Sequence, residues 1–284
     1  MFRTRVISAA VLVPVVAIAF LAGNPWLTIG VAALTLVAAI EGASLIRRAG
    51  LPADPGIPIL LAPLAVLGTL TDWTLAGALA FDVAVIVLAA VAAFRHREAR
   101  AAFLGWVGGS FGAIYVSLLA FVPLAMLAAP AVPRTSPLHG VLDAGRIWVL
   151  ILVLTVWACD TFAYLVGRRY PRGRMLPHLS PNKTWSGGIG GTVAAMIACG
   201  VLATVLAGAH PIVAALLGGF IAIAAQAGDA SESLLKRAAG AKDSGRAIPG
   251  HGGILDRVDS FLFAAPALYV VLVMAPDLLV AGAG

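Results

Sequence analysis

Long apolar runs, broken by short polar segments, dominate the chain. A helix crosses a bilayer with about 17 to 25 apolar residues, and nine runs come close to or reach that length, at 6–22, 27–46, 57–72, 75–94, 103–128, 147–166, 188–208, 211–228 and 258–280. The run at 57–72 is short and rich in proline, which makes it the weakest of the nine. The pattern predicts an all-α, polytopic integral membrane protein with about nine transmembrane helices.

The composition supports a membrane protein. Of the 284 residues, 61% are hydrophobic and 11% are charged, whereas a soluble domain is about half apolar and about a quarter charged. The two cysteines, Cys159 and Cys199, lie inside apolar runs without metal-ligand spacing, so we interpret them as small packing residues.

The positive charges lie on one side of the predicted membrane. If the N-terminus is cytoplasmic, all of the 19 Lys and Arg residues except Arg134 and Arg146 fall in cytoplasmic segments, as the positive-inside rule expects. This placement accounts for the net charge of +6 without a nucleic-acid partner. The first run also has the positive start and small-residue end of a signal peptide, and we expect it to remain as the first helix.

The polar residues divide the chain into two regions of one membrane domain. Region 1–145 has short loops and is expected to be a scaffold that faces lipid. Region 146–284 contains the long, basic, glycine-bearing segments 167–187 and 229–257, both predicted to be cytoplasmic. We therefore expect the chemistry in the second region.

Three carboxylates lie within or at the edge of apolar runs, where an acid is either functional or satisfied by a neighbour. Glu41 and Asp82 stand alone, and the sequence leaves both interpretations open. Asp160 shares one helix face with Trp157 and Tyr164, at i, i+3 and i+7. That face either lines a polar cavity near the membrane surface or ties its acid to a nearby arginine.

The segment 179–191, LSPNKTWSGGIGG, combines hydroxyls, an ammonium and glycines at the start of a span. Ser180, Lys183 and Thr184 precede the glycines, and backbone amides at a helix start beside a lysine can hold a phosphate. The order differs from that of a P-loop, so no nucleotide site follows from that motif. The alternative is a capped helix start whose glycines allow close packing.

The strongest pattern flanks the last polar segment. Asp229, Glu232, Ser233 and Lys236 form one helical stripe at i, i+3, i+4 and i+7, and Asp256 and Asp259 open the last span, where carboxylates are favourable. We expect these acids at one membrane depth, where carboxylate oxygens suit Mg²⁺ that also holds phosphates. A self-neutralising salt-bridge network is the alternative, but it does not explain the glycines at 245, 250, 252 and 253.

Residues 233–259, SLLKRAAGAKDSGRAIPGHGGILDRVD, resemble the signature of the phosphatidate cytidylyltransferase (CDP-diacylglycerol synthase) family and match its fixed positions without a gap. The stretches CDTFAYLVGR and SPNKTWSGG resemble the family's other motifs, so the resemblance covers most of 157–259. The family commonly has Lys and Glu where this chain has Asn182 and Ser186, and no direct role is expected for these two residues.

The resemblance implies that CTP and phosphatidate react to give CDP-diacylglycerol and pyrophosphate for phospholipid biosynthesis. Mg²⁺, with or without a second cation, would be held by Asp229 and Asp256, with Asp259 and Asp160 as further candidates. His251 would contact a phosphate or orient its loop, rather than act as a base. The resemblance assigns catalysis to Asp229, Lys236, Lys242, His251 and Asp256, and substrate binding to Ser180, Lys183, Thr184, Ser233, Arg237, Asp243, Gly252, Gly253 and Arg257.

Other functions fit the pattern less well. A related membrane enzyme could use CTP on a polyprenol or another lipid. An ion transporter would spread its polar residues through the depth of the membrane, whereas here they concentrate at one predicted level. The expected partners are therefore CTP, phosphatidate and membrane lipid, in a bacterial-type inner membrane with the active site on the cytoplasmic side, and the resemblance alone implies a homodimer.

Overall fold

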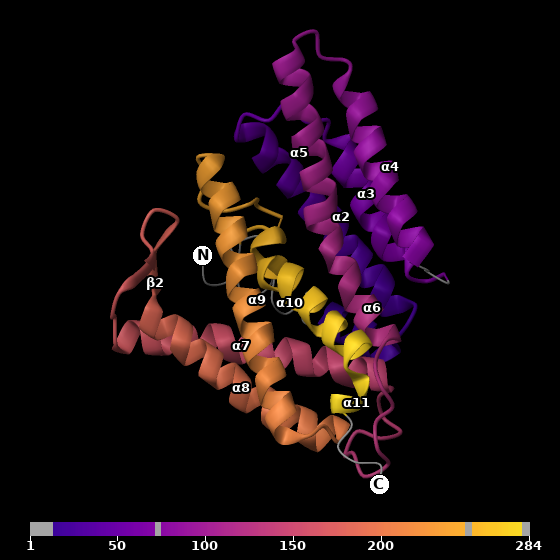
Figure 1. Ribbon diagram of the computed structural model, residues 1–284, viewed down its shortest axis with the longest axis vertical. Helices are drawn as coiled ribbons and strands as arrows, with labels where there is room; N and C mark the ends of the chain where they lie inside the picture. Colours follow the sequence, from indigo (N-terminus) through magenta and orange to yellow (C-terminus); the bar gives the residue numbers. More distant parts are fainter. Residues whose placement is uncertain (1–13, 72–74, 248–251, 280–284) are drawn as a thin grey trace. The chain divides into compact units, whose positions relative to one another are not determined.

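The computed structural model describes residues 14–71, 75–247 and 252–279, and most of them are helical (Figure 1). They form two compact units, each built from segments far apart in the sequence. Unit 1 comprises Met1–Pro123 with Leu234–Val258, and unit 2 comprises Leu124–Ser233 with Asp259–Gly284. The expected functional division at residue 145 stays a prediction, while the structural units place the loop before the last span with the N-terminal helices.

Unit 1 is a helical bundle in which α5 packs against α2, α3 and α4. Its helices are α2 (Trp26–Arg48), α3 (Gly56–Gly68), α4 (Leu75–Ala93), α5 (Ala99–Ser117) and the short η1 (Leu118–Ala120). A Cβ added at Gly112 of α5 would lie 2.7 Å from Ile46 Cδ1 of α2. The bundle is therefore closely packed where α5 meets α2.

Unit 2 contains a helical hairpin and a small strand pair. Helices α7 (Ala144–Arg169) and α8 (Trp185–Ala207) lie side by side, joined through the antiparallel strands β1 (Arg174–Leu176) and β2 (Ser180–Thr184) (Figure 1). The strand pair is a small departure from the predicted all-α fold. The remaining helices are α6 (Phe121–Leu127), α9 (Pro211–Ala238), α10 (Leu255–Met274) and α11 (Pro276–Leu279), of which α6, α9 and α10 contribute to both units.

Small residues form the buried side of α8. Gly187, Gly191, Ala195, Cys199 and Ala203 recur every four residues and are buried, as helices that pack closely in a membrane require. The opposite side carries large apolar residues that are about half exposed, namely Ile189, Val193, Ile197, Val201 and Val205. One helix face thus packs on protein, and the other is suited to lipid.

The described residues contain six helices that are long and apolar enough to cross a membrane. They confirm six of the predicted spans and are Trp26–Arg48, Ala99–Leu127, Ala144–Arg169, Trp185–Ala207, Pro211–Ala238 and Leu255–Met274. The third predicted span is the shorter apolar helix Gly56–Gly68, and the fourth corresponds to α4, which is apolar over Gly77–Ala93. The first predicted span lies partly outside the described residues, and 14–22 are helical. The structure fits a multi-pass membrane protein, and the count of nine is not confirmed.

Candidate active site: two polar clusters

The first polar cluster lies in unit 2 and joins strand β2 to helices α7 and α9. Lys183, at the end of β2, places its Nζ 2.6 Å from Asp229 Oδ2 of α9. Asp160 of α7 interacts electrostatically with both groups. We call these three residues the lysine–carboxylate cluster. Lys183 is the cation that interacts with Asp160 in this cluster, and the two interpretations of the α7 face, a polar cavity or an arginine partner, stay predictions.

Close packing of α7 on α8 brings this cluster together. A Cβ added at Gly187 would lie 2.6 Å from the backbone oxygen of Ala163, and one at Gly191 would lie 2.7 Å from that of Cys159. Such distances leave no room for any side chain at either position. The glycines therefore set the approach of the two helices, and Lys183 reaches the acids because it lies just before α8.

The first amides of α8 already have hydrogen-bond partners. Trp185 N donates to Gly173 O (2.9 Å), Ser186 N donates to Arg172 O (3.4 Å), and Gly187 N donates to the hydroxyl of the N-cap residue Thr184 (3.1 Å). These contacts favour the alternative interpretation, in which a hydroxyl caps the helix and the glycines pack. The phosphate cradle stays a prediction.

Two polar residues near the cluster were not predicted from the sequence. The Gln226 side chain of α9 donates to Thr192 Oγ1 (3.0 Å) and Gly188 O (3.4 Å) of α8. The Ser186 hydroxyl donates to Tyr170 O and accepts from Arg172 N (3.2 Å). Gln226 lies three residues before Asp229, and its polar side chain within an apolar run is the signal that identifies it. Both residues hold backbone in place.

The second polar cluster lies in unit 1 and centres on Asp256. We call residues 239–254, between α9 and α10, the signature loop; its described part is 239–247 and 252–254. Asp256 Oδ2 accepts from Ser244 N (2.9 Å), Ser244 Oγ (2.9 Å) and Gly253 N (3.0 Å). Asp256 Oδ1 pairs with Lys236 Nζ at 2.7 Å. One carboxylate thus joins both ends of the loop to α9.

These contacts change the interpretation of two predicted site residues. Three donors already meet one oxygen of Asp256, so a metal ligated by that oxygen would have to displace them. The amide of Gly253 donates to the same oxygen and is not directed at a phosphate. Asp256 thus acts as an organiser of the loop, and its predicted role as a metal ligand has no support in these contacts.

The structure places the other predicted residues as follows. Ser180 lies in β2 at partial exposure, and Lys242, Asp243 and Arg257 are exposed. Ser233 Oγ lies 3.5 Å from Asp229 Oδ1, and Arg237 donates to Ala241 O (3.4 Å). Asp259 accepts from the adjacent Ser260 amide (2.6 Å). Gly252 has a φ of 87°, which favours glycine, and His251 lies outside the described residues.

The lysine–carboxylate cluster offers two carboxylates as candidate metal ligands, one of which is already paired with Lys183. Within the described ranges, no three His, Cys, Asp or Glu side chains are grouped to hold a metal. A Mg²⁺ ion that also binds substrate phosphates needs only one or two carboxylates. Asp160 and Asp229 provide two, against a single ammonium from Lys183. When both acids are ionised, the cluster keeps excess negative charge that a cation would neutralise.

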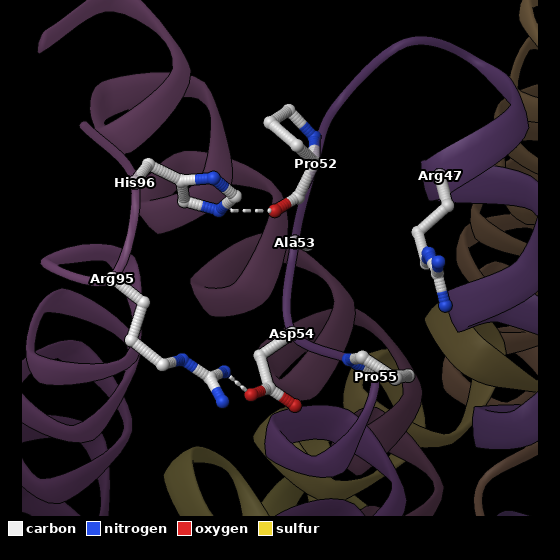
Figure 2. A pocket seen from close by; sticks show the side chains of 7 residues that line it. All are labelled: Arg47, Pro52, Ala53, Asp54, Pro55, Arg95 and His96. Carbon is white, nitrogen blue, oxygen red and sulfur yellow. Dashed lines mark hydrogen bonds and ion pairs between the residues drawn. The ribbon is translucent and has the colours of Figure 1, made fainter. Parts of the chain in front are cut away.

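A hollow of about 670 Å³ lies elsewhere in unit 1 (Figure 2). Its wall contains the Arg95–Asp54 ion pair and the contact between His96 Nε2 and Pro52 O (2.9 Å), with Arg47 on α2. No residue with a predicted role in the chemistry lines it. The hollow is therefore not the candidate active site.

Comparison with known proteins identifies the family. A model of the cytidylyltransferase family matches residues 3–275, almost the whole chain. The chain belongs to the cytidylyltransferase family. This match confirms the family that the signature at 233–259 predicts.

Relatives in this family carry the name phosphatidate cytidylyltransferase. One from Mycobacterium bovis is 34% identical over 264 residues, covering 88% of this chain and 81% of the relative. One from Brucella abortus biovar 1 is 44% identical over 151 residues, covering 51% of this chain and 54% of the relative. The chain thus spans about half the length of the Brucella relatives that it matches. The similarity is strong over a shorter segment and moderate over most of the chain.

Proposed function

We propose that this cytidylyltransferase-family protein transfers the CMP moiety of CTP to phosphatidate, giving CDP-diacylglycerol and pyrophosphate. The observation that carries the proposal is the match of the signature at 233–259, in which Lys236 and Asp256 form an ion pair in unit 1. The names of the relatives support the same reaction. Apolar helices long enough to hold the protein in the membrane suit a lipid substrate.

The chemistry requires charge neutralisation more than proton transfer. A phosphomonoester has its second pKa near 6, so the phosphate of phosphatidate is already an anion at neutral pH. It can attack the α-phosphorus of CTP without a dedicated base, and the bond from that phosphorus to the β-phosphate oxygen breaks to release pyrophosphate. Positioning and electrostatic stabilisation then provide most of the catalysis, as in other phosphoryl transfers.

The residues have distinct proposed roles. Asp229 and Asp160 would hold Mg²⁺, which would offset negative charge on the reacting phosphates. Lys183, already beside Asp229, would place a positive charge next to the same phosphates. In unit 1, Lys236 would orient Asp256, and Lys242, which is exposed on the signature loop, would contact the triphosphate.

The two polar segments are proposed to face the cytoplasm. Helices α8 and α9 are both long enough to span the membrane, so the end of α9 would return to the side on which α8 begins. The segments 167–187 and 229–257 would then lie on one side, with most of the Arg and Lys residues. CTP is cytosolic and phosphatidate stays in the bilayer, so a site at headgroup level would serve both. Homodimerisation stays a prediction.

The decisive experiment is a product assay with purified protein in mixed micelles. Radiolabelled CTP, Mg²⁺ and phosphatidate should yield a CDP-lipid on thin-layer chromatography, and excess EDTA should abolish it until Mg²⁺ is restored. A parallel reaction with a polyprenyl phosphate tests the nearest alternative lipid. Absence of a CDP-lipid with phosphatidate, or product from the polyprenyl phosphate alone, would reject the proposal.

A further inference from the structure

Glu41 contacts the signature loop from the other end of the chain. This α2 residue is only 7% exposed. Its Oε2 accepts from the backbone N of Leu255 (2.8 Å) and lies 3.1 Å from Ser244 Oγ. The two partners lie 214 and 203 residues away in the sequence. A carboxylate of the predicted scaffold is therefore part of the structure around Asp256.

The contact caps the start of α10. Leu255 is the first residue of α10, and the first amides of a helix have no partner within it. Glu41 accepts the amide of Leu255, and the Ser244 hydroxyl accepts that of Asp256 (3.2 Å). A negative charge is favourable at a helix N-terminus. Glu41 thus stabilises the turn on which Asp256 lies.

Two loop glycines fit against this carboxyl group. A Cβ added at Gly245 would lie 2.5 Å from Glu41 Cδ and 2.7 Å from its Cγ, and one at Gly253 would lie 2.5 Å from its Oε2. Close approach to Glu41 therefore explains Gly245, and close approach to Ser244 Oγ and Glu41 together explains Gly253; the sequence had associated both glycines with phosphate binding. The loop is shaped around this side chain.

Ser244 links Glu41 to Asp256. Ser244 Oγ lies within hydrogen-bonding distance of both Glu41 Oε2 and Asp256 Oδ2, and a hydroxyl has a single proton to donate. In the described part of the chain Glu41 makes no ion pair with a Lys or Arg side chain, and its partners there, Leu255 N and the Ser244 hydroxyl, are both neutral. A carboxylate placed only to balance a nearby cation would instead be paired with that cation.

We propose that Glu41 is a positioning residue for nucleotide transfer: it holds Ser244 and the start of α10 in the arrangement that orients Asp256 and the signature loop toward CTP. The catalytic part of this inference rests on the proposed function, whereas the contact itself does not. Glu41 touches neither substrate in this scheme and acts through the loop.

Kinetics of three variants test the positioning role. Glu41→Ala and Glu41→Asp should lower kcat/KM for CTP by about 30-fold, the value of one or two lost charge-assisted hydrogen bonds. The KM for CTP should rise while the KM for phosphatidate stays within about twofold, because only the loop is displaced. Glu41→Gln keeps an oxygen at the position of Oε2, where both Leu255 N and Ser244 Oγ make their contacts, so it should retain most of the activity. Glu98→Ala, at an exposed glutamate of unit 1, is the matched control.

A double-mutant cycle tests the contact without any assay of activity. Gly245→Ala should lower the melting temperature of the purified protein because its Cβ meets Glu41. Combining it with Glu41→Ala should remove that clash, so the double variant should lose less than the sum of the two single variants. Additive losses would overturn the contact.

Other results of these experiments would overturn the positioning role or the proposed function. A wild-type KM for CTP in Glu41→Ala, or equal loss in Glu41→Gln and Glu41→Ala, would overturn the positioning role. A uniform loss of kcat with both KM values unchanged would also overturn it, because that result indicates only less folded protein. If the wild-type protein makes no CDP-lipid, the proposed function and the catalytic part of the inference are both rejected. The double-mutant cycle of melting temperatures still tests whether Glu41 contacts Gly245.

Discussion

At the residue scale, the aspartates of the two clusters differ in what surrounds them. Asp229 faces the ammonium of Lys183 and another carboxylate, whereas three hydrogen-bond donors enclose Oδ2 of Asp256. The surroundings of Asp229 therefore suit a cation, whereas those of Asp256 suit a role in holding the loop. Sequence spacing and the family resemblance assigned both to metal binding.

Paired substitutions separate these roles. Asp229→Asn should raise the Mg²⁺ concentration for half-maximal activity by about tenfold or more, because a metal ligand loses its charge. Asp256→Asn should reduce kcat by about 100-fold without changing that concentration, because an amide NH₂ in place of Oδ2 would face donors. The measurement is a Mg²⁺ titration of CDP-lipid formation, with Asp277→Asn, at an exposed aspartate, as control. Rescue of Asp256→Asn by high Mg²⁺ would instead make Asp256 a metal ligand.

At the scale of elements, the α7–α8 hairpin shows what the sequence could and could not predict. The length of each helix, the cap at Thr184 and the acid face of α7 all follow from local patterns. The role of the glycines does not, because a glycine-rich helix start is compatible with both phosphate binding and close packing. Only the distance from Gly187 and Gly191 to the α7 backbone decides between them.

A matched pair of substitutions on α8 tests that packing. Gly191→Ala places a Cβ against the α7 backbone at 2.7 Å, whereas Gly200→Ala places one at an ordinary 3.4 Å from Ala215 Cβ. Overpacking costs about 1–3 kcal/mol, so Gly191→Ala should lower the melting temperature and, by displacing Lys183, the activity. Gly200→Ala should leave both close to wild type. Equal behaviour of the two variants in thermal melts and CDP-lipid assays would show that these glycines do not set the helix approach.

At the scale of the whole molecule, the apolar pattern predicted the membrane-protein class and six spans correctly. Its weakest run corresponds to α3, which has 13 residues and contains Pro63. Such a helix covers about 20 Å of a hydrocarbon core about 30 Å thick, and the count of nine spans is not confirmed. The pattern of polar residues also divided the chain at residue 145 into a predicted scaffold and a predicted catalytic region. It could not show that the signature loop packs with α2, since contacts over 200 residues leave no periodic trace.

Membrane orientation can be measured with single cysteines. Arg172→Cys, exposed between α7 and β1, and Val141→Cys, 65% exposed before α7, should lie on opposite sides. A membrane-impermeant maleimide added to intact spheroplasts should label the cysteine at 141, and the one at 172 only after permeabilisation. The native Cys159 and Cys199 are buried, which keeps the background low. Labelling at 172 in intact spheroplasts would invert the proposed topology.

The capping of α10 by Glu41 has a consequence for synthesis. The glutamate emerges from the ribosome 214 residues before Leu255, its amide donor. At about 5–20 residues per second, that carboxylate waits about 10–40 s for its partner. Chains that stop before α10 keep an acid in an apolar bundle with no donor from Leu255, at a cost in free energy. The nascent protein would therefore be susceptible to quality-control proteases until α10 is synthesised. Assembly of unit 1 would be complete only when the signature loop and α10 reach Glu41.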